Sequence, residues 1–251
     1  MAEPSDLPGN TEGSNGTRKS SDHQTTALSP NKDVGLGYWN NVECNVDGML
    51  GGFSVVSRID LQSSRNFLAK LGIGAKPGLR VVDRALEGGA GIGRVTEGLL
   101  LKVAKTVDII EPVIKFTDTI KGKDGVCKIH NVGLEEWRPT QDDQYDLIWT
   151  QWCVGHLSDA QLLQYLKECK SALKPGTGLA VVKENLSTID VDMFDEIDSS
   201  ITRRDDKFRS LFAEAGLAIV RTELQKGFPK SNLGKLLPVR VYALKPVSSA
   251  S

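Results

Sequence analysis

The chain has 251 residues, of which 39% are hydrophobic and 25% charged, enough for one sizeable domain with a buried core. Its formal net charge of -1 gives no electrostatic case for a nucleic acid or an anionic membrane as the main partner. The four cysteines and three histidines lack metal-ligand spacing, so we expect reduced thiols and no metal site. We find no apolar signal core and no run near the roughly 20 apolar residues of a membrane span, so the expected location is cytosolic or nuclear.

The beginning of the chain differs in composition from the rest. Residues 1–37 are rich in Ser, Thr, Gly, Pro, Asn and charge, contain no aromatic residue, and follow neither helical nor strand periodicity. They are predicted to form a disordered arm before a folded domain over residues 38–246. Within this domain, residues 38–78 are expected to form a lid and a helix, and residues 79–246 the core. The glycines of Met49-Leu50-Gly51-Gly52 provide the flexibility that a lid needs.

From residue 79 onward, predicted strands alternate with helices. Apolar spacing over residues 95–103 and 208–215 indicates helices, and Ser158-x-x-Gln161 is a capping box that opens another, ended by Lys174-Pro175-Gly176. This βαβ series predicts an α/β fold with a parallel sheet, closed by an antiparallel pair of final strands. The expected strands cover residues 79–86, 107–110, 127–132, 145–149, 179–183, 217–224 and 239–244.

A glycine-rich turn follows the first predicted strand and reads Glu87-x-Gly89-x-Gly91-x-Gly93-Arg94. Glycines at such a turn let a ligand approach the backbone closely. Arg94 stands where a dinucleotide fingerprint has its third glycine, and the Glu87 carboxylate would repel a pyrophosphate but stabilise a sulfonium. The turn therefore favours S-adenosylmethionine over a dinucleotide. The alternative is a turn that only packs a helix on a strand.

Two further side chains fit this cofactor. Arg94 can bind the carboxylate of its methionine part. Glu111, at the end of the second predicted strand, can accept hydrogen bonds from both ribose hydroxyls. The position of Glu111 makes a cofactor site the better interpretation of the glycine turn.

An ordered set of motifs carries a resemblance to a known family. Over residues 38–245 the chain resembles the eukaryotic alpha-N-terminal protein methyltransferases. The motifs are Tyr38-Trp39, Val46-Asp47-Gly48-Met49-Leu50-Gly51-Gly52, Gly89-Ala90-Gly91-Ile92-Gly93-Arg94, Ile148-Trp149-Thr150-Gln151-Trp152, Gly155-His156-Leu157, Lys183-Glu184-Asn185 and Asp198-Ser199-Ser200.

The resemblance implies a class I S-adenosylmethionine-dependent methyltransferase with a Rossmann-like seven-stranded sheet. Such an enzyme methylates the free α-amine of proteins that begin X-Pro-Lys once the initiator Met is removed, ribosomal proteins among them. It also implies a monomer located in the cytoplasm and nucleus. The departures at Glu87, Gly88 and Glu111 from the family's usual residues put the affinity for the cofactor in question.

The resemblance also implies which residues bind the cofactor and the substrate. Beside Glu87 and Gly91 of the glycine turn, the implied cofactor residues are Gly89, Arg94, Glu111, Gly133, Leu134, Glu135 and Gln151. The implied substrate residues are Trp39, Leu50, Trp152, Asp195 and Ser200, with Asn185, Asp198 and His156 in catalytic positions.

The chemistry of these residues suits a peptide N-terminus. His156 and Asp198 can take a proton from an amine whose ordinary pKa is about 7.7 to 8.0. Trp39 and Trp152 can hold a proline ring between them, and Asn185 can donate to the first peptide carbonyl. Asp195 and Asp198 would share a face and receive the lysine ammonium if their segment is helical.

Each role has a plain structural alternative. The acidic stretch 190–206 can be a solvated surface, Asn185 can cap a turn, and His156 can orient a loop. Two other functions also stay open. A small-molecule or other amine methyltransferase would act on free amines and be indifferent to Asp195 and Asp198. A catalytically weakened peptide-binding protein would bind the peptide without the cofactor.

Overall fold

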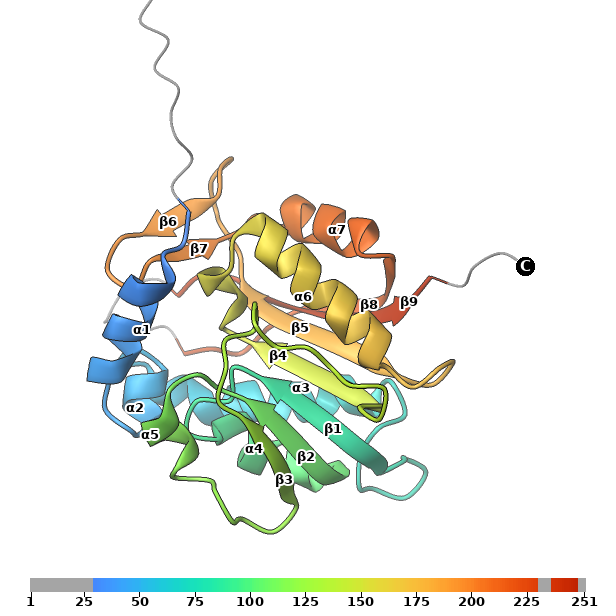
Figure 1. Ribbon diagram of the computed structural model, residues 1–251. Helices are drawn as coiled ribbons and strands as arrows, with labels where there is room; N and C mark the ends of the chain where they lie inside the picture. The colour runs from blue at the N-terminus through green and yellow to red at the C-terminus, as the bar shows by residue number, and fades with distance from the viewer. Residues whose placement is uncertain (1–28, 230–235, 248–251) are drawn as a thin grey trace, which may run out of the picture.

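A seven-stranded mixed sheet forms the centre of the protein, as seen in the computed structural model, which describes residues 29–229 and 236–247 (Figure 1). The strands lie in the order β3-β2-β1-β4-β5-β9-β8; the first five are parallel, and β9 runs antiparallel between β5 and β8. This order confirms the predicted α/β fold and its antiparallel closing pair. The strands are β1 (Val82–Gly88), β2 (Ala104–Ile110), β3 (Val126–His130), β4 (Leu147–Gln151), β5 (Leu179–Asn185), β8 (Leu217–Leu224) and β9 (Val239–Pro246).

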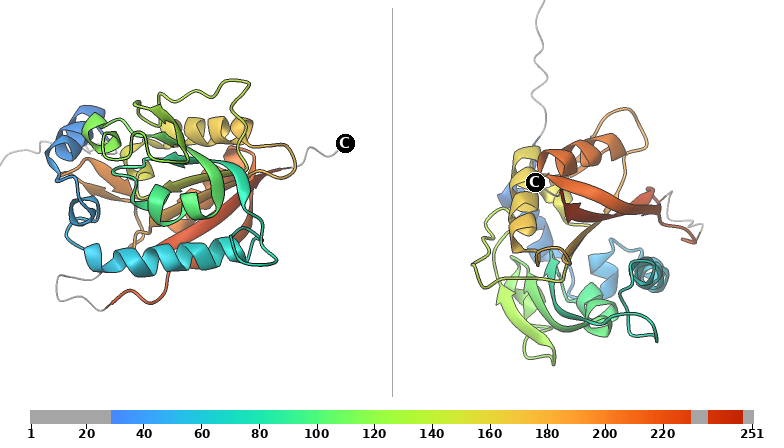
Figure 2. Two further views of the ribbon diagram at one scale, coloured as in Figure 1. Left: turned by 90° about the horizontal axis from the view of Figure 1, so that it is seen from below. Right: turned by 90° about the vertical axis from the view of Figure 1, so that its right-hand side faces the viewer.

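Helices cover both faces of this sheet, as a parallel sheet requires. Two of them, α6 and α7, lie on one face, and α3 and α4 lie on the other (Figure 2). None of the helices among the described residues is long and apolar enough to cross a bilayer. The helices are α1 (Lys32–Asn41), α2 (Val46–Met49), α3 (Ser57–Ala69), α4 (Arg94–Gly98), α5 (Ile114–Thr117), α6 (Asp159–Ala172) and α7 (Asp205–Glu214).

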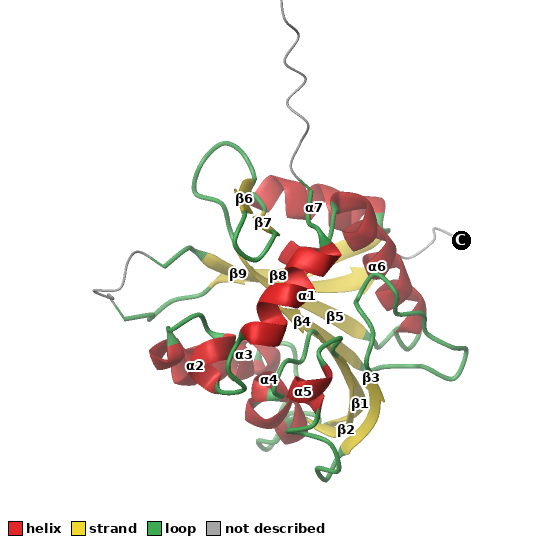
Figure 3. Ribbon diagram, turned by 60° about the vertical axis from the view of Figure 1, so that its left-hand side comes forward, coloured by secondary structure: helices red, strands yellow, loops and turns green. Residues whose placement is uncertain are grey.

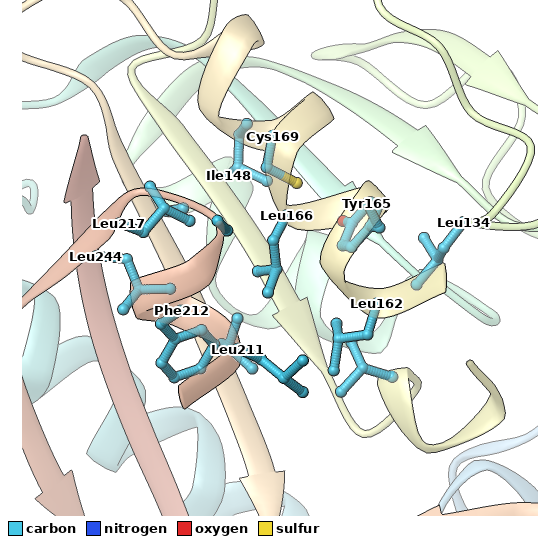
Figure 4. Packing of buried hydrophobic residues seen from close by; sticks show 14 of the residues in the cluster. Leu134, Ile148, Leu162, Tyr165, Leu166, Cys169, Leu211, Phe212, Leu217 and Leu244 are labelled. Carbon is cyan, nitrogen blue, oxygen red and sulfur yellow. The ribbon is translucent and has the colours of Figure 1, made fainter. Parts of the chain in front are cut away.

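The core is two apolar layers separated by the sheet, because successive side chains of a strand point to opposite faces. Ile148 of β4 belongs to the layer under α6 and α7, whereas its neighbour Trp149 belongs to the layer under α3 and α4. In the first layer, Leu166 of α6 and Phe212 of α7 pack together over the sheet (Figure 4). Because β1 to β5 run parallel, their carboxyl ends lie at one edge of the sheet, where a ligand site is expected.

The predicted arm is too long at its C-terminal end. Helix α1 begins at Lys32, and the Asn31 side chain caps it by accepting from the backbone N–H groups of Asp33 and Val34. Helix α1 lies beside the hairpin of β6 (Met193–Asp195) and β7 (Ser200–Thr202), and the backbone N–H of Asn31 donates to Ser199 Oγ in the turn of that hairpin over 2.8 Å (Figure 3). Tertiary contacts thus order the segment from Asn31 to residue 37, although its composition predicted disorder. The rest of the predicted arm, residues 1–28, lies outside the described part of the chain.

The helix considered for the acidic stretch is wrong. The chain there forms an antiparallel hairpin of β6 (Met193–Asp195) and β7 (Ser200–Thr202), in which Asp195 pairs with Ser200. In the connecting turn, Asp195 Oδ1 accepts the backbone N–H of Ile197 over 2.8 Å, a local bond that competes with helix formation. Ser199 has a φ of 54°, in the left-handed region that a helix does not use.

The capping box of α6 is confirmed and makes a testable contribution to stability. The Ser158 hydroxyl accepts the backbone N–H of Gln161, and the Gln161 side chain accepts that of Ser158. Ser158→Ala is expected to lower the free energy of unfolding by about 1 kcal/mol in urea denaturation, because it leaves helix N–H groups without a partner. Ser171→Ala is the control, since the Ser171 hydroxyl is exposed near the other end of α6. Equal effects of the two substitutions would contradict the role of the cap.

Candidate active site

A single cavity at the carboxyl ends of β1, β2 and β4 collects most of the predicted site residues beneath α1 and α2. Asn185 and the three hairpin residues Asp195, Asp198 and Ser200 do not line this cavity. The cofactor half of the predicted site is therefore assembled as expected, and the hairpin lies outside the lining. The predicted residues that line the cavity are Trp39, Leu50, Glu87, Gly89, Gly91, Arg94, Glu111, Gly133, Leu134, Glu135, Gln151, Trp152 and His156.

The glycine turn after β1 has no room for side chains. Gly89 and Gly91 have φ values of 68° and 55°, which favour glycine. A Cβ on Gly89 would meet the Cys153 side chain at 2.5 Å, and one on Gly91 would meet Met49 Sδ at 2.8 Å. Because Met49 belongs to α2, the predicted lid touches the turn directly. The packing of Cys153 and Met49 against the turn therefore requires these glycines, and both glycines also line the cavity.

Glu111 stands beside this turn, at the end of β2, and holds the turn in place. Its Oε2 accepts the backbone N–H of Gly91 over 2.8 Å, and its Oε1 accepts that of Val113 over 2.9 Å. A carboxylate has about four acceptor positions, so two remain for ribose hydroxyls. Burial raises the pKa of Glu111, while the two backbone bonds oppose the shift.

Glu87 is less exposed than a carboxylate on a ligand-facing turn would be. Its side chain is 3% exposed and accepts the Thr96 hydroxyl of α4 in a short hydrogen bond. Burial raises its pKa to about 8, with the Thr96 bond and the charge of Arg94 opposing. At neutral pH, Glu87 is therefore largely protonated in the protein without a ligand, and a cation in the cavity would favour its ionisation.

Arg94, at the start of α4, is held by an acid that the motif does not contain. Its Nη1 lies 2.8 Å from Oδ2 of Asp60, a residue of α3, and its guanidinium lies over the Trp152 ring, 5.3 Å from the centroid. Gln151 Nε2 donates to both Asp60 oxygens over 3.0 Å, and Gln151 Oε1 accepts the indole N–H of Trp149. Although burial acts to raise the pKa of Asp60, its basic neighbours hold that pKa below the usual value. Two predicted cofactor residues, Arg94 and Gln151, thus share one buried partner.

The turn after β3 carries the other predicted cofactor residues and contacts α1. Gly133, Leu134 and Glu135 line the cavity. Lys32 of α1 reaches this turn, with its Nζ at 2.8 Å from Glu135 Oε1 and 2.5 Å from Glu136 Oε1. Helix α1 is therefore connected by charge to the cofactor side of the cavity.

Trp39 and His156 meet at the acceptor side of the cavity. The indole N–H of Trp39 donates to His156 Nε2 over 2.9 Å. Burial lowers the pKa of His156, and the nearby Asp198 opposes the shift. A neutral imidazole that accepts at Nε2 carries its proton on Nδ1. In this arrangement, His156 has no free acceptor nitrogen for a substrate proton.

The short turn that carries His156 is fixed by Glu184, the residue before Asn185 at the end of β5. Glu184 Oε1 accepts the backbone N–H groups of Cys153 and Val154 over 2.8 and 3.2 Å. Burial raises the pKa of Glu184 to about 7, against the lowering effect of these backbone bonds. Trp152, just before the turn, has a φ of 55°, a conformation that costs energy for a bulky residue and persists where neighbours enforce it.

The hairpin places its acids against α1, outside the cavity lining. Burial raises the pKa of Tyr38 in α1, and the charges of Asp198 and Asp195 add to the effect, so both acids face this hydroxyl. Asp195 is exposed, whereas Asp198 is partly buried. Asn185 is half-buried at the end of β5, and its backbone N–H donates to Glu184 Oε2 over 3.1 Å.

Sequence reasoning missed Asp60, Lys183 and Glu184, although each leaves a trace in the sequence. Asp60 and Ser64 share a helical face with Phe67 and Leu68, so two polar side chains lie on the buried face of α3. Lys183 and Glu184 extend an apolar run in a central strand, where charged residues need partners. Buried charge on an otherwise apolar face would have identified all three.

Three buried polar atoms in this region lack a partner among the described residues: Trp152 Nε1, His156 Nδ1 and Asp198 Oδ1. Buried polar groups are rarely left unpaired, so these atoms are ones that a ligand would satisfy. No group of His, Cys, Asp and Glu suited to a metal ion occurs in residues 29–229 and 236–247. The cavity lining fits a nucleoside with a carboxylate-bearing tail, because the Glu111 carboxylate can accept from ribose hydroxyls and the Arg94 cation can bind a carboxylate.

Fold and site together define an S-adenosylmethionine-dependent methyltransferase. Residues 29–245 match the model of a family described as AdoMet dependent proline di-methyltransferase. AdoMet is S-adenosylmethionine, and the chain belongs to this family.

Several known proteins are similar over most of the chain. Alpha N-terminal protein methyltransferase 1 of Schizosaccharomyces pombe is 45% identical over 220 residues, covering 85% of this chain and 95% of the relative. N-terminal Xaa-Pro-Lys N-methyltransferase 1 of Homo sapiens is 38% identical over 197 residues, covering 76% of this chain and 86% of the relative. A solved SAM-dependent methyltransferase from Leishmania major is similar with a TM-score of 0.75 and 37% identity, covering 84% of this chain and 81% of that one.

The raised pKa of Glu87 predicts a pH-dependent effect of its removal. Between its ordinary pKa of 4.5 and about 8, Glu87 is protonated in the folded protein and ionised in the unfolded chain, so its contribution to stability falls as the pH rises. Glu87→Gln should therefore raise the Tm of the ligand-free protein by a few degrees relative to wild type at pH 8, and by less at pH 5. Thermal unfolding followed by circular dichroism across this range measures the difference.

Glu214→Gln makes the same substitution at an exposed position in α7 and should shift the Tm little at either pH. A Tm difference for Glu87→Gln that is constant from pH 5 to pH 8 would show that Glu87 is ionised throughout.

Proposed function

We propose that this protein transfers methyl groups from S-adenosylmethionine to the free α-amine of proteins whose N-terminus reads Xaa-Pro-Lys. The human relative and a Xenopus laevis relative, N-terminal Xaa-Pro-Lys N-methyltransferase 1-B, are both named after this substrate motif. The structural observation that carries the proposal is one cavity in which the glycine turn and Arg94 lie together with Trp39, Trp152 and His156. A cofactor and a short peptide N-terminus would meet there.

The proposed acceptor must lose a proton before it can react. An N-terminal amine has an ordinary pKa of about 7.7 to 8.0, so a modest base is enough at neutral pH. Asp198 does not line the cavity, but its Oδ1 is buried without a partner near His156, which does line it, so Oδ1 can accept from an ammonium that reaches past His156. His156 Nε2 already accepts from Trp39, so His156 becomes a base only if that hydrogen bond breaks. We assign the proton-accepting role first to Asp198, with His156 as its neighbour.

Other residues would hold the peptide. When bound, S-adenosylmethionine supplies an electrophilic methyl group on its sulfonium. Trp39 and Trp152 line the cavity and offer indole faces to a proline ring, which loses little entropy on binding. Asp195, which is exposed and paired with Ser200 on the hairpin, would receive the lysine ammonium. Positioning of this kind can supply about 7 to 11 kcal/mol of the barrier reduction in a two-reactant step.

The remaining parts of the proposal rest on family resemblance. We propose ribosomal proteins as substrates, a monomer as the active form, and the cytoplasm and nucleus as the location. Leu50 would contact the peptide from the lid, and Asn185 would donate to its first carbonyl.

Mass spectrometry of three peptides tests the acceptor. A Ser-Pro-Lys peptide incubated with the enzyme and S-adenosylmethionine should gain methyl increments of mass. Its N-acetylated form should gain none, because the amine is blocked. A peptide with the lysine changed to glutamine should react more slowly, because it lacks the cation that Asp195 would receive. Equal methylation of the acetylated peptide would show that an atom other than the α-amine is methylated. Methylation of simple amines alone would favour a small-molecule methyltransferase.

The role of Asp198 predicts a loss of turnover. Asp198→Asn should lower kcat on the Ser-Pro-Lys peptide by about 100- to 1000-fold, since an amide cannot accept the proton. Glu196→Gln, an exposed substitution in the same turn, is the control and should leave kcat within about twofold of wild type. An unchanged kcat in Asp198→Asn would assign proton acceptance to His156 or to water.

A further inference from the structure

A buried cluster of charges lies directly behind the cavity. Asp60 of α3 and Lys183 of β5 have side chains that are 0% and 1% exposed, and Lys183 Nζ lies 2.5 Å from Asp60 Oδ1. The other Asp60 oxygen lies 2.8 Å from Arg94 Nη1. One carboxylate is therefore bound by two cations, of which Arg94 lines the cavity and Lys183 does not.

The geometry around Lys183 favours the charged form, with Asp60 opposing the lowering of the Lys183 pKa by burial. Besides Asp60 Oδ1, its Nζ lies within hydrogen-bonding distance of the Asp60 backbone carbonyl, Ser64 Oγ and Gln225 Oε1, at 3.3, 3.0 and 3.0 Å. An ammonium has three protons to donate to such a set of oxygens, whereas a neutral amine has two. Lys183 is thus a cation held entirely by protein oxygens.

The charges of this cluster do not cancel. Arg94 and Lys183 carry +2 and Asp60 carries -1, which leaves +1 at the wall of the cavity. Glu87, the acid of the glycine turn, has its pKa raised by burial to about 8, so at neutral pH it does not neutralise this charge. Buried charges are costly unless they are paired, so the cluster is complete only when an anion binds on the cavity side.

We propose that Lys183 is a positioning residue for the cofactor carboxylate. It neutralises the negative charge of Asp60, so that Asp60 can orient the Arg94 guanidinium while the positive charge of Arg94 remains available to bind the carboxylate. Asp60 also holds the Gln151 amide on the same wall, and Lys183 supports this arrangement from behind. The inference rests on the cofactor of the family and does not depend on the acceptor proposed above.

The charges give an unusual prediction for two variants. Lys183→Met leaves Asp60 and Arg94 as a neutral pair, so a carboxylate would compete with Asp60 for the guanidinium. Changing Asp60 to Asn in addition removes that competitor and returns the cluster to +1. The double variant, although it loses more hydrogen bonds, should therefore bind the carboxylate better than Lys183→Met alone.

Isothermal calorimetry with two ligands tests this without any methyl acceptor. S-adenosylhomocysteine keeps the carboxylate of the cofactor, and methylthioadenosine lacks the whole amino-acid part. For Lys183→Met we expect about 10- to 100-fold weaker binding of S-adenosylhomocysteine, with methylthioadenosine within about threefold of wild type. The Asp60→Asn, Lys183→Met double variant should recover most of the lost affinity. Lys70→Met, at a lysine whose side chain is 48% exposed, is the control and should bind both ligands like wild type.

Two results would overturn the proposal. If Lys183→Met weakened the binding of both ligands equally, Lys183 would only support the fold. If the double variant bound S-adenosylhomocysteine as weakly as Lys183→Met does, neutralisation of Asp60 would not be the role of Lys183. Circular dichroism establishes that each variant is folded. If Lys183→Met does not fold, Lys183→Gln replaces it with the same expectations, because its amide donates to Asp60 without a charge. Failure of the peptide to become methylated would leave these binding results unaffected.

Discussion

The contact between Asp60 and Lys183 joins two parts of the protein that are remote in sequence. Asp60 lies on the helix that follows the predicted lid, and Lys183 lies near the end of the central strand β5. Their buried ion pair brings α3 to the carboxyl edge of the sheet, and Arg94 and Gln151 bind the same carboxylate. The side chains of the cofactor cavity wall are therefore held by the sheet and α3 together.

Helix α1 connects the two halves of the cavity. At its beginning, Lys32 pairs with Glu135 on the cofactor side, and the Asn31 backbone binds Ser199 on the hairpin. Near its end, Trp39 donates to His156. A helix held at all three points covers the cofactor and acceptor regions at once, so a displacement of α1 would open both. This arrangement suits an enzyme whose two substrates must meet in one enclosed space.

Part of the cofactor half, namely Glu87, Arg94 and Glu111, could be predicted from residue chemistry and spacing, whereas Gly133, Leu134, Glu135 and Gln151 were implied only by the family resemblance. Glu87 and Arg94 flank the turn after β1, and Glu111 ends β2; in a parallel sheet these positions meet at one edge. The acceptor half was predicted mainly from family resemblance, since Trp39, His156 and Asp198 are far apart along the chain. Residue spacing does not show which of their atoms are free, because this depends on side-chain orientation. Trp39, for example, donates to Nε2 of His156 and so occupies that nitrogen.

Two expectations, a disordered arm up to residue 37 and a possible helix in the acidic stretch, were wrong for different physical reasons. The segment before residue 38 has the composition of a disordered chain, yet from Lys32 it is helical because Asn31, Lys32 and Trp39 find partners on other elements. The acidic stretch has i, i+3 spacing of Asp195 and Asp198, yet a local bond from Asp195 and the left-handed Ser199 give a hairpin. At α1, tertiary contacts outweigh a weak local preference, whereas in the acidic stretch a local side-chain bond and the conformation of Ser199 decide against a helix.

The sequence by itself determined the order of strands and helices, the capped start of α6 and the glycine turn, because these depend on periodicity and on backbone chemistry within a few residues. Only the tertiary structure decided which acid holds Arg94, how Glu184 fixes the turn of His156, and where the acidic hairpin lies. The physical reason is that a buried charge is stable only beside its partner, and that partner is brought there by the packing of elements that lie between 31 and 123 residues apart in the chain.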